Sequence, residues 1–236
     1  MAVAAIIAVA FFGESIFGFG GGLISIPLLS LLLGVRDAVT LVLIFQLCMG
    51  SLIWKSYKHI NWKAAKPMTV SIAIGTLVGT LLLSKASTSF LELFLGISIL
   101  IFLIKMAWFS GFTFGRRRSE IAATTAGLGG GLFTGLIGTG GPVLTMYLSA
   151  AIAQKLAIRA TLIYLFFVTS VIRLGISIHE HLFTAHILNL ALVALPCFIV
   201  AILLGQHVHE KINDKYYRLG IYIILGGSAI VLLSKA

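Results

Sequence analysis

The sequence predicts an all-α membrane protein that crosses the bilayer several times, and three observations lead to this prediction. Of the 236 residues, 59% are hydrophobic and only 10% are charged, whereas roughly a quarter of the residues in a soluble domain are charged. The apolar residues fall in long runs, and about 20 of them are needed to cross the hydrocarbon core. Two of the runs carry matching glycine-rich interruptions. We expect the whole chain, residues 1–236, to form a single membrane domain.

Charges and turn residues divide the chain into eight hydrophobic stretches, most of them of the length of one crossing. The first and fifth are too long, because an unbroken helix of that length would measure about 50 Å against a hydrocarbon core of about 30 Å. Each is interrupted in its middle, by FGESIFGFGGGLISIPLL at 12–29 and by GLIGTGGPVLTMYL at 135–148. The eight stretches are 1–33, 38–54, 67–84, 88–104, 121–154, 157–178, 183–206 and 216–234.

The two halves of the chain match each other at an offset of 120 residues. At this offset Gly18-Phe19-Gly20-Gly21-Gly22 aligns with Gly138-Thr139-Gly140-Gly141-Pro142, and the apolar runs that follow stay matched within a few residues. The sequence therefore predicts a first repeat at 1–109, a cytoplasmic linker at 110–120 and a second repeat at 121–236. Internal repeats are the usual construction of secondary transporters.

The distribution of positive charge predicts that the two repeats are inverted. If the first and fifth stretches are broken, re-entrant hairpins, each repeat has three further spanning helices. The loops 55–66, 105–120, 155–159 and 211–218 then share one side and hold 13 of the 17 Lys and Arg residues. Because cytoplasmic loops carry the excess of Lys and Arg, we expect these basic loops in the cytoplasm and both termini outside.

The glycine clusters are predicted to be breaks that form an anion site. Glycine costs a helix roughly 1 kcal/mol relative to alanine and proline about 3 kcal/mol, so clusters of them inside a span indicate intended helix ends. New helices are expected to begin near Gly22 and Pro142, and the unpaired N–H groups of a helix start attract anions. The alternative is that the glycines only allow close helix packing. We expect the site where the two broken hairpins meet.

Several polar residues near the breaks are candidate ligands, each with a structural alternative. Ser25, Thr139 and Thr145 have hydroxyls that could bind the anion, but a Ser or Thr in a membrane helix often bonds a carbonyl one turn back. Gln46 could hydrogen-bond a ligand or a neighbouring helix. The sequence leaves these alternatives open.

Two ionisable residues inside the apolar stretches are also candidates, since such residues default to a functional role in membranes. Glu14, just before the first glycine cluster, could bind a coupling proton or cap a helix at the interface. Arg173 could be the counter-charge of an anion, or its side chain could extend to the membrane surface.

Other classes of function are not supported by the sequence. The net charge of +10 resides mainly in short loops, so we expect no nucleic-acid partner. No G-x-S-x-G, H-E-x-x-H or P-loop motif is present, so we expect no enzyme and no cofactor. Cys48 and Cys197 have no metal-ligand spacing, and the histidines gather at stretch ends, so no metal site is expected.

The motifs GFGGGLISIPLLSLLLG at 18–34 and GLIGTGGPVLTMYL at 135–148 resemble those of the TauE/SafE family, the sulfite exporter family of membrane transporters, over nearly the whole chain. The resemblance implies a prokaryotic inner-membrane permease for small sulfur-containing anions. It also implies which glycines and prolines line the passage: Gly18, Gly20, Gly21, Gly22, Pro27, Gly138, Gly140, Gly141 and Pro142.

We therefore expect a secondary transporter that exports a small anion such as sulfite or an organosulfonate. Its expected partners are this anion, a coupling proton or counter-ion, and the lipid bilayer; a homodimer is left open. One alternative is a passive channel for a small anion or neutral solute. Another is a membrane component that binds partners without moving a solute.

Overall fold

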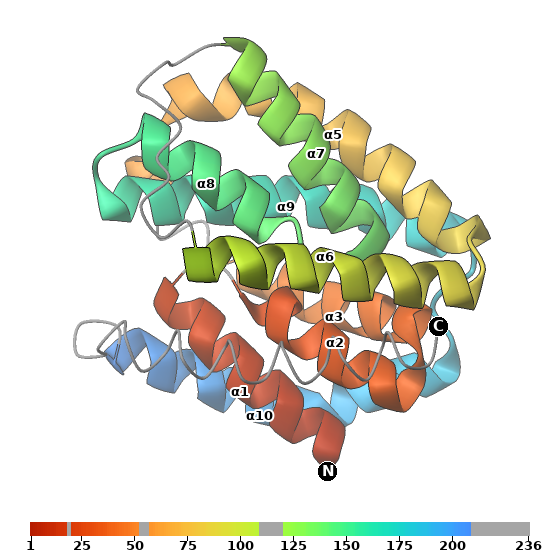
Figure 1. Cartoon of the computed structure of the whole chain (residues 1–236). Coiled ribbons are helices and arrows are strands. Elements are labelled where there is room, and N and C mark those ends of the chain that lie inside the picture. The colour runs from red at the N-terminus through yellow and green to blue at the C-terminus, as the bar shows by residue number, and fades with distance from the viewer. Residues whose placement is uncertain (18–19, 52–56, 109–119, 209–236) are drawn as a thin grey trace. The chain divides into compact units, whose positions relative to one another are not determined.

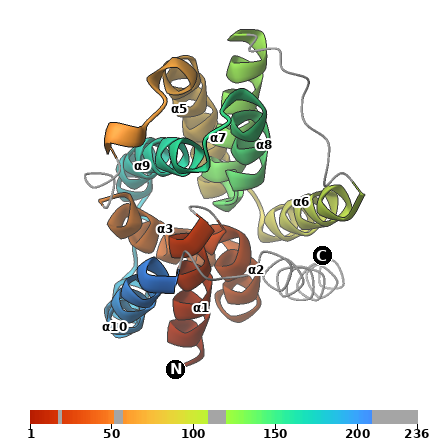
Figure 2. The same cartoon turned by 90° about the vertical axis from the view of Figure 1, so that its left-hand side faces the viewer.

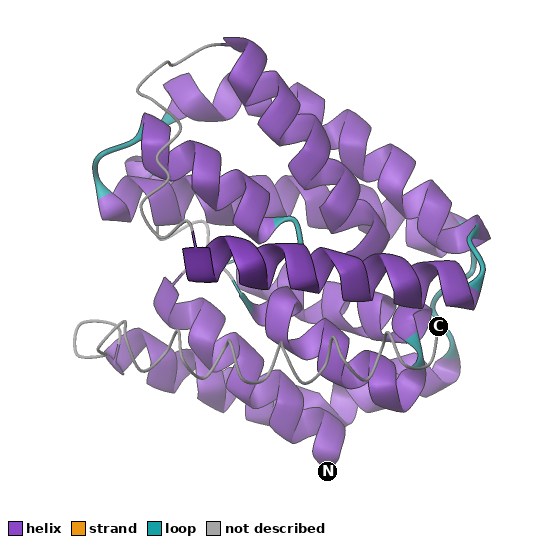
Figure 3. Ribbon diagram, viewed as in Figure 1, coloured by secondary structure: helices purple, strands orange, loops and turns teal. Residues whose placement is uncertain are grey.

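A computed structural model describes residues 1–17, 20–51, 57–108 and 120–208. The secondary-structure elements among these residues are all helices, joined by loops, with no strand among them (Figure 3). The all-α prediction is therefore confirmed. The helices in chain order are α1 (Ala2–Phe17), α2 (Gly21–Leu33), α3 (Val35–Gly50), the 3₁₀ turn η1 (Tyr57–His59), α5 (Trp62–Lys85), α6 (Thr88–Trp108), α7 (Glu120–Ile137), α8 (Gly141–Ala151), α9 (Lys155–His179) and α10 (Ala185–Val208).

Within the described part of the chain, three helices are long and apolar enough to cross a membrane. They are Trp62–Lys85, Leu156–His179 and Ala185–Gly205. The prediction of a polytopic membrane protein is thereby confirmed. The inverted orientation of the repeats stays a prediction, and the eighth stretch, 216–234, lies outside the described residues.

Both long hydrophobic stretches are broken at their glycines, as predicted. The first stretch forms α1 and α2, separated by residues 18–20, and the fifth forms α7 and α8, separated by residues 138–140. We call these segments the first break and the second break. The chain folds into two compact units, and each break lies in a different one.

Unit 1 comprises Met1–Val42, Ala86–Phe112 and Ala185–Ala236. Here α1 packs alongside α10 (Figures 1 and 2). The contact is close because Gly205 has no side chain: a Cβ there would meet the hydroxyl of Ser15. That hydroxyl donates a hydrogen bond to the carbonyl of Ile202 at 3.3 Å. One turn earlier, the rings of Phe11 and Phe198 meet edge to face with centroids 5.0 Å apart.

Unit 2 comprises Leu43–Lys85 and Thr113–Thr184. Its most extensive contact joins α5 to α7, which lie side by side in both views (Figures 1 and 2). Glycines at every fourth position let the two backbones touch, as in other membrane helix pairs. A Cβ on any of these glycines would clash with the backbone or a hydroxyl of the facing helix: Gly75, Gly79, Gly127, Gly131 and Gly135.

Helix α9 completes unit 2 and packs against both α5 and α8. Near its start, the hydroxyl of Thr161 accepts a hydrogen bond from the backbone N–H of Asn61 at 3.0 Å. Further along, the ring of Tyr164 meets that of Trp62 edge to face, with centroids 5.1 Å apart. These contacts fix the rotation of α9, which carries Arg173 about three turns later.

Candidate functional site

The backbone of both breaks requires glycine. Gly20 has a φ of 112° and Gly138 a φ of 69°, which is the left-handed region that costs other residues roughly 1–2 kcal/mol. Gly20 directly precedes α2, and Gly138 directly follows α7. Gly18, another predicted site residue, lies outside the described residues.

At the second break, the chain folds back tightly along α7. A Cβ on Gly140 would meet the carbonyl oxygen of Gly130 and the hydroxyl of Thr134, so only glycine fits at this approach. Helix α8 then begins at Gly141, with Pro142 in its first two positions, as predicted. The first hydrogen bond of the helix runs from the N–H of Leu144 to the carbonyl of Gly140 at 3.3 Å. The N–H groups before Leu144 therefore belong to the helix start, where a helix has no partner of its own for them.

A buried arginine is connected to this break by a chain of hydrogen bonds. Nη1 of Arg173, on α9, donates to Oε1 of Gln46, on α3, at 2.7 Å. Nε2 of Gln46 then donates to the carbonyl of Gly138 at 3.3 Å. Arg173 is 1% exposed and Gln46 is 7% exposed. The side chain of Arg173 is thus buried in the protein and hydrogen-bonded within unit 2.

The three candidate hydroxyls differ in their partners. Thr139, inside the second break, is 3% exposed. The hydroxyl of Thr145, one turn into α8, is buried and has no hydrogen-bond partner in the described part of the chain. Ser25, in unit 1, donates to the carbonyl of Gly21 at 2.6 Å, four residues back, which is the arrangement that the structural alternative describes.

At the first break the notable group is an acid. Glu14 lies in the last turn of α1 and is 5% exposed. Its carboxyl group lies against the backbone N–H of Gly21, the first residue of α2. A Cβ on Gly21 would coincide with Oε2 of Glu14. Gly22 and Pro27 are buried further along α2.

The predicted residues thus form two separate groups. Unit 2 gathers the glycines of the second break with Gln46 and Arg173, and unit 1 gathers Glu14 with the start of α2. Sequence reasoning missed Thr134, which lies under Gly140. The sequence does contain a signal for Thr134, because the offset of 120 residues that aligns the two breaks also aligns Thr134 with Glu14.

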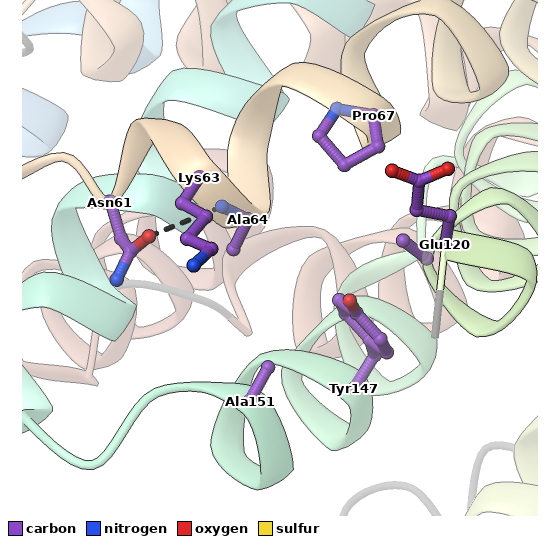
Figure 4. Close-up of a pocket in the computed structure, with 8 residues that line it drawn as sticks. Asn61, Lys63, Ala64, Pro67, Glu120, Tyr147 and Ala151 are labelled. Carbon is purple, nitrogen blue, oxygen red and sulfur yellow. Dashed lines mark hydrogen bonds between the residues drawn. The ribbon is translucent and has the colours of Figure 1, made fainter. Parts of the chain in front are cut away.

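A cavity of about 230 Å³ lies elsewhere in unit 2 (Figure 4). It is bounded by the starts of α5 and α7 and by the second half of α8, and it carries both a positive and a negative side chain, Lys63 and Glu120. Asn61, at its edge, accepts a hydrogen bond from the N–H of Ala64 at 3.1 Å. None of the predicted site residues lines this cavity; its lining is Asn61, Lys63, Ala64, Pro67, Glu120, Ala123, Tyr147 and Ala151.

Comparison with known proteins identifies the family. A family model described as "Sulfite exporter TauE/SafE" matches residues 3–232. The chain belongs to the TauE/SafE family. This confirms the family expected from the two glycine-rich motifs, and its description is that of an exporter, not of an enzyme.

One curated TauE/SafE relative is the "Probable sulfite/organosulfonate exporter TauE" of Cupriavidus necator. It is 26% identical over 228 residues, which cover 92% of this chain and 88% of the relative. No solved structure matches the chain.

Proposed function

We propose that this member of the TauE/SafE family is a secondary transporter that exports a small sulfur-containing oxyanion, such as sulfite or an organosulfonate. The proposal takes its substrate class from the family description and from the curated relative. The observation that carries it is the buried Arg173, linked through Gln46 to the glycine-rich start of α8. Each of these elements favours a negative ligand.

The electrostatics of unit 2 support an anion at the second break. An oxyanion carries the charge opposite to that of the buried guanidinium, and opposite charges attract strongly in a membrane interior. The planar guanidinium matches the oxygens of an oxyanion with paired N–H donors. The start of α8 adds backbone N–H groups and the positive end of its dipole.

The residues proposed to bind the anion have separate roles. Arg173 supplies the charge, and Gln46 positions Arg173 relative to the break. Gly140 and Gly141 bring the backbone N–H groups of the start of α8 close to the ligand, because no Cβ stands in the way. Gly138, whose own N–H donates to the carbonyl of Thr134, allows the left-handed turn that leads to this start. The hydroxyls of Thr139 and Thr145 are additional donors.

The arrangement in the membrane is part of the same proposal. The chain resides in a prokaryotic inner membrane, with the basic loops in the cytoplasm and both termini outside. The two inverted repeats rock against each other, and this motion opens the binding site alternately to the two sides of the membrane. Glu14 carries the coupling proton.

The first experiment replaces Gly140. In proteoliposomes loaded with sulfite, Gly140→Leu is expected to lose exchange of external labelled sulfite, because its side chain would collide with the Gly130 carbonyl and the Thr134 hydroxyl. Gly175→Ala in α9 is the matched control, since a Cβ there meets nothing within 4 Å. Unchanged exchange in a correctly inserted Gly140→Leu protein would contradict the proposal, and fast non-saturating flux in the wild type would indicate a channel.

The coupling role of Glu14 requires a different measurement. Glu14→Gln removes the exchangeable proton and keeps the shape of the side chain. We expect sulfite exchange to persist in this variant while a pH gradient no longer drives net sulfite movement. Accumulation that still follows the pH gradient would exclude Glu14 as the proton carrier.

A further inference from the structure

The carboxyl group of Glu14 is buried, and among the described residues it has no positively charged partner. It is 5% exposed, and no described side chain forms an ion pair or a hydrogen bond with it. Its Oε2 atom has no hydrogen-bond partner in the described part of the chain. A buried carboxylate of this kind is costly unless some other positive group compensates it.

The group that faces Glu14 is the start of α2. The carboxyl lies against the N–H of Gly21, and Oε2 occupies the place that a Cβ on Gly21 would take. A Cβ on Gly21 would also lie 3.2 Å from the ring of Phe11, so the space beside Gly21 is bounded by this ring as well as by the carboxyl. Only a glycine at position 21 allows this contact.

The backbone of α2 makes its start a suitable anion binder. Its first internal hydrogen bond runs from Ile24 N–H to the carbonyl of Gly20 at 3.0 Å. The N–H groups of residues 21–23 therefore belong to the first turn, where a helix has no partner of its own for them. The helix is 13 residues long, and its dipole places roughly half a positive charge at this end.

We infer that the start of α2 is a binding site for a small carboxylate or similar oxyanion, and that the chain fills this site with its own Glu14 side chain. A free anion can enter only after the Glu14 carboxylate is removed. This inference uses unit 1 alone and goes beyond the proposed transport function.

The test is chemical rescue of Glu14→Ala. Purified wild type and variant are melted in sodium formate and, at equal ionic strength, in sodium gluconate, whose anion is too bulky for the vacated space. We expect formate to raise the Tm of Glu14→Ala by about 3 °C in a saturable manner. The wild type should not respond, because Glu14 already fills the site.

The matched control is Glu92→Ala, which removes an acid of α6 in the same unit. If formate stabilises this variant equally, or does not stabilise Glu14→Ala, the inference is wrong.

Glu14→Gln provides a second measurement that does not depend on recovery of the alanine variant. The amide keeps the volume of the side chain but leaves the start of α2 without its negative charge. Because the amide still fills the space of the carboxyl, formate should not raise the Tm of this variant, and a saturable rise of about 3 °C in Glu14→Gln would overturn the inference. Because no sulfur anion is used, the result stands apart from the proposed transport: rescue by formate without sulfite flux would reject only the transport.

Discussion

The two breaks share their backbone chemistry and differ in charge. In each, a left-handed glycine precedes a new helix, Gly20 before α2 and Gly138 before α8. In each, a residue from the last turns of the preceding helix lies under the glycines. In unit 1 that residue is Glu14, and in unit 2 it is Thr134, which is 120 residues further along.

Because of this difference, the starts of α2 and α8 face different chemical groups. The start of α2 already faces a carboxylate that belongs to the chain. The start of α8 faces the neutral Thr134, and a guanidinium is connected to the neighbouring break. The polar residues that make this connection have no counterpart in the other repeat, since the same offset aligns Gln46 with Phe166 and Arg173 with Ile53. The sequence match at this offset thus includes the glycines of the two breaks but not the charged and polar residues beside them.

The largest effect on sulfite binding is expected when an acid is placed at position 134, which corresponds to Glu14 in the first repeat. Thr134→Glu would place a carboxylate under Gly140, close to the start of α8, as Glu14 lies close to the start of α2. We expect sulfite affinity to fall by about 100-fold or more, since one charged hydrogen-bonded contact contributes on the order of 2–5 kcal/mol. The measurement is sulfite exchange in proteoliposomes.

Thr134→Gln is the control variant, because it adds a side chain of similar volume without a charge. If both variants lose exchange equally, the loss reflects packing against Gly140, and the comparison of the two breaks no longer explains their function.

A somewhat smaller loss of sulfite affinity is expected when Arg173 is replaced, and a lysine at this position should restore part of it. Arg173→Gln should weaken sulfite binding by about 30- to 100-fold, in line with the loss of a buried charged contact. Arg173→Lys should recover part of the affinity, since it keeps the charge but loses the paired N–H donors. A purely structural role, in which Arg173 only holds Gln46, would lower the Tm of both variants without this graded change in affinity.

The sequence predicted the features of the fold that depend on local chemistry. Two stretches were too long for one crossing and contained glycine clusters, so their division into α1, α2, α7 and α8 could be expected. The start of α8 at Pro142 followed from the preference of proline for the first turn.

The features that depend on packing between helices could not be predicted in this way. Whether Arg173 faces lipid, solvent or protein depends on the rotation of α9, which contacts such as Tyr164 with Trp62 determine. The sequence spacing of Glu14 and Gly21 did not reveal that the carboxyl contacts the helix start, because the intervening turn had no predictable geometry. The glycine spacing of α5 and α7 was visible, but only the structure shows that these two helices face each other.

The smallest expected effect concerns Thr145, whose hydroxyl is buried near the second break and has no hydrogen-bond partner among the residues that the structure describes. An unsatisfied buried hydroxyl costs about 1–3 kcal/mol, so Thr145→Val should leave the protein as stable as before or more stable. If the hydroxyl donates to the anion, the same change should weaken sulfite binding several-fold, while Thr145→Ser should keep it. Binding and stability are measured together by melting the protein over a series of sulfite concentrations. An unchanged sulfite response in Thr145→Val would remove this hydroxyl from the site, and would leave Arg173 and the start of α8 as its remaining donors.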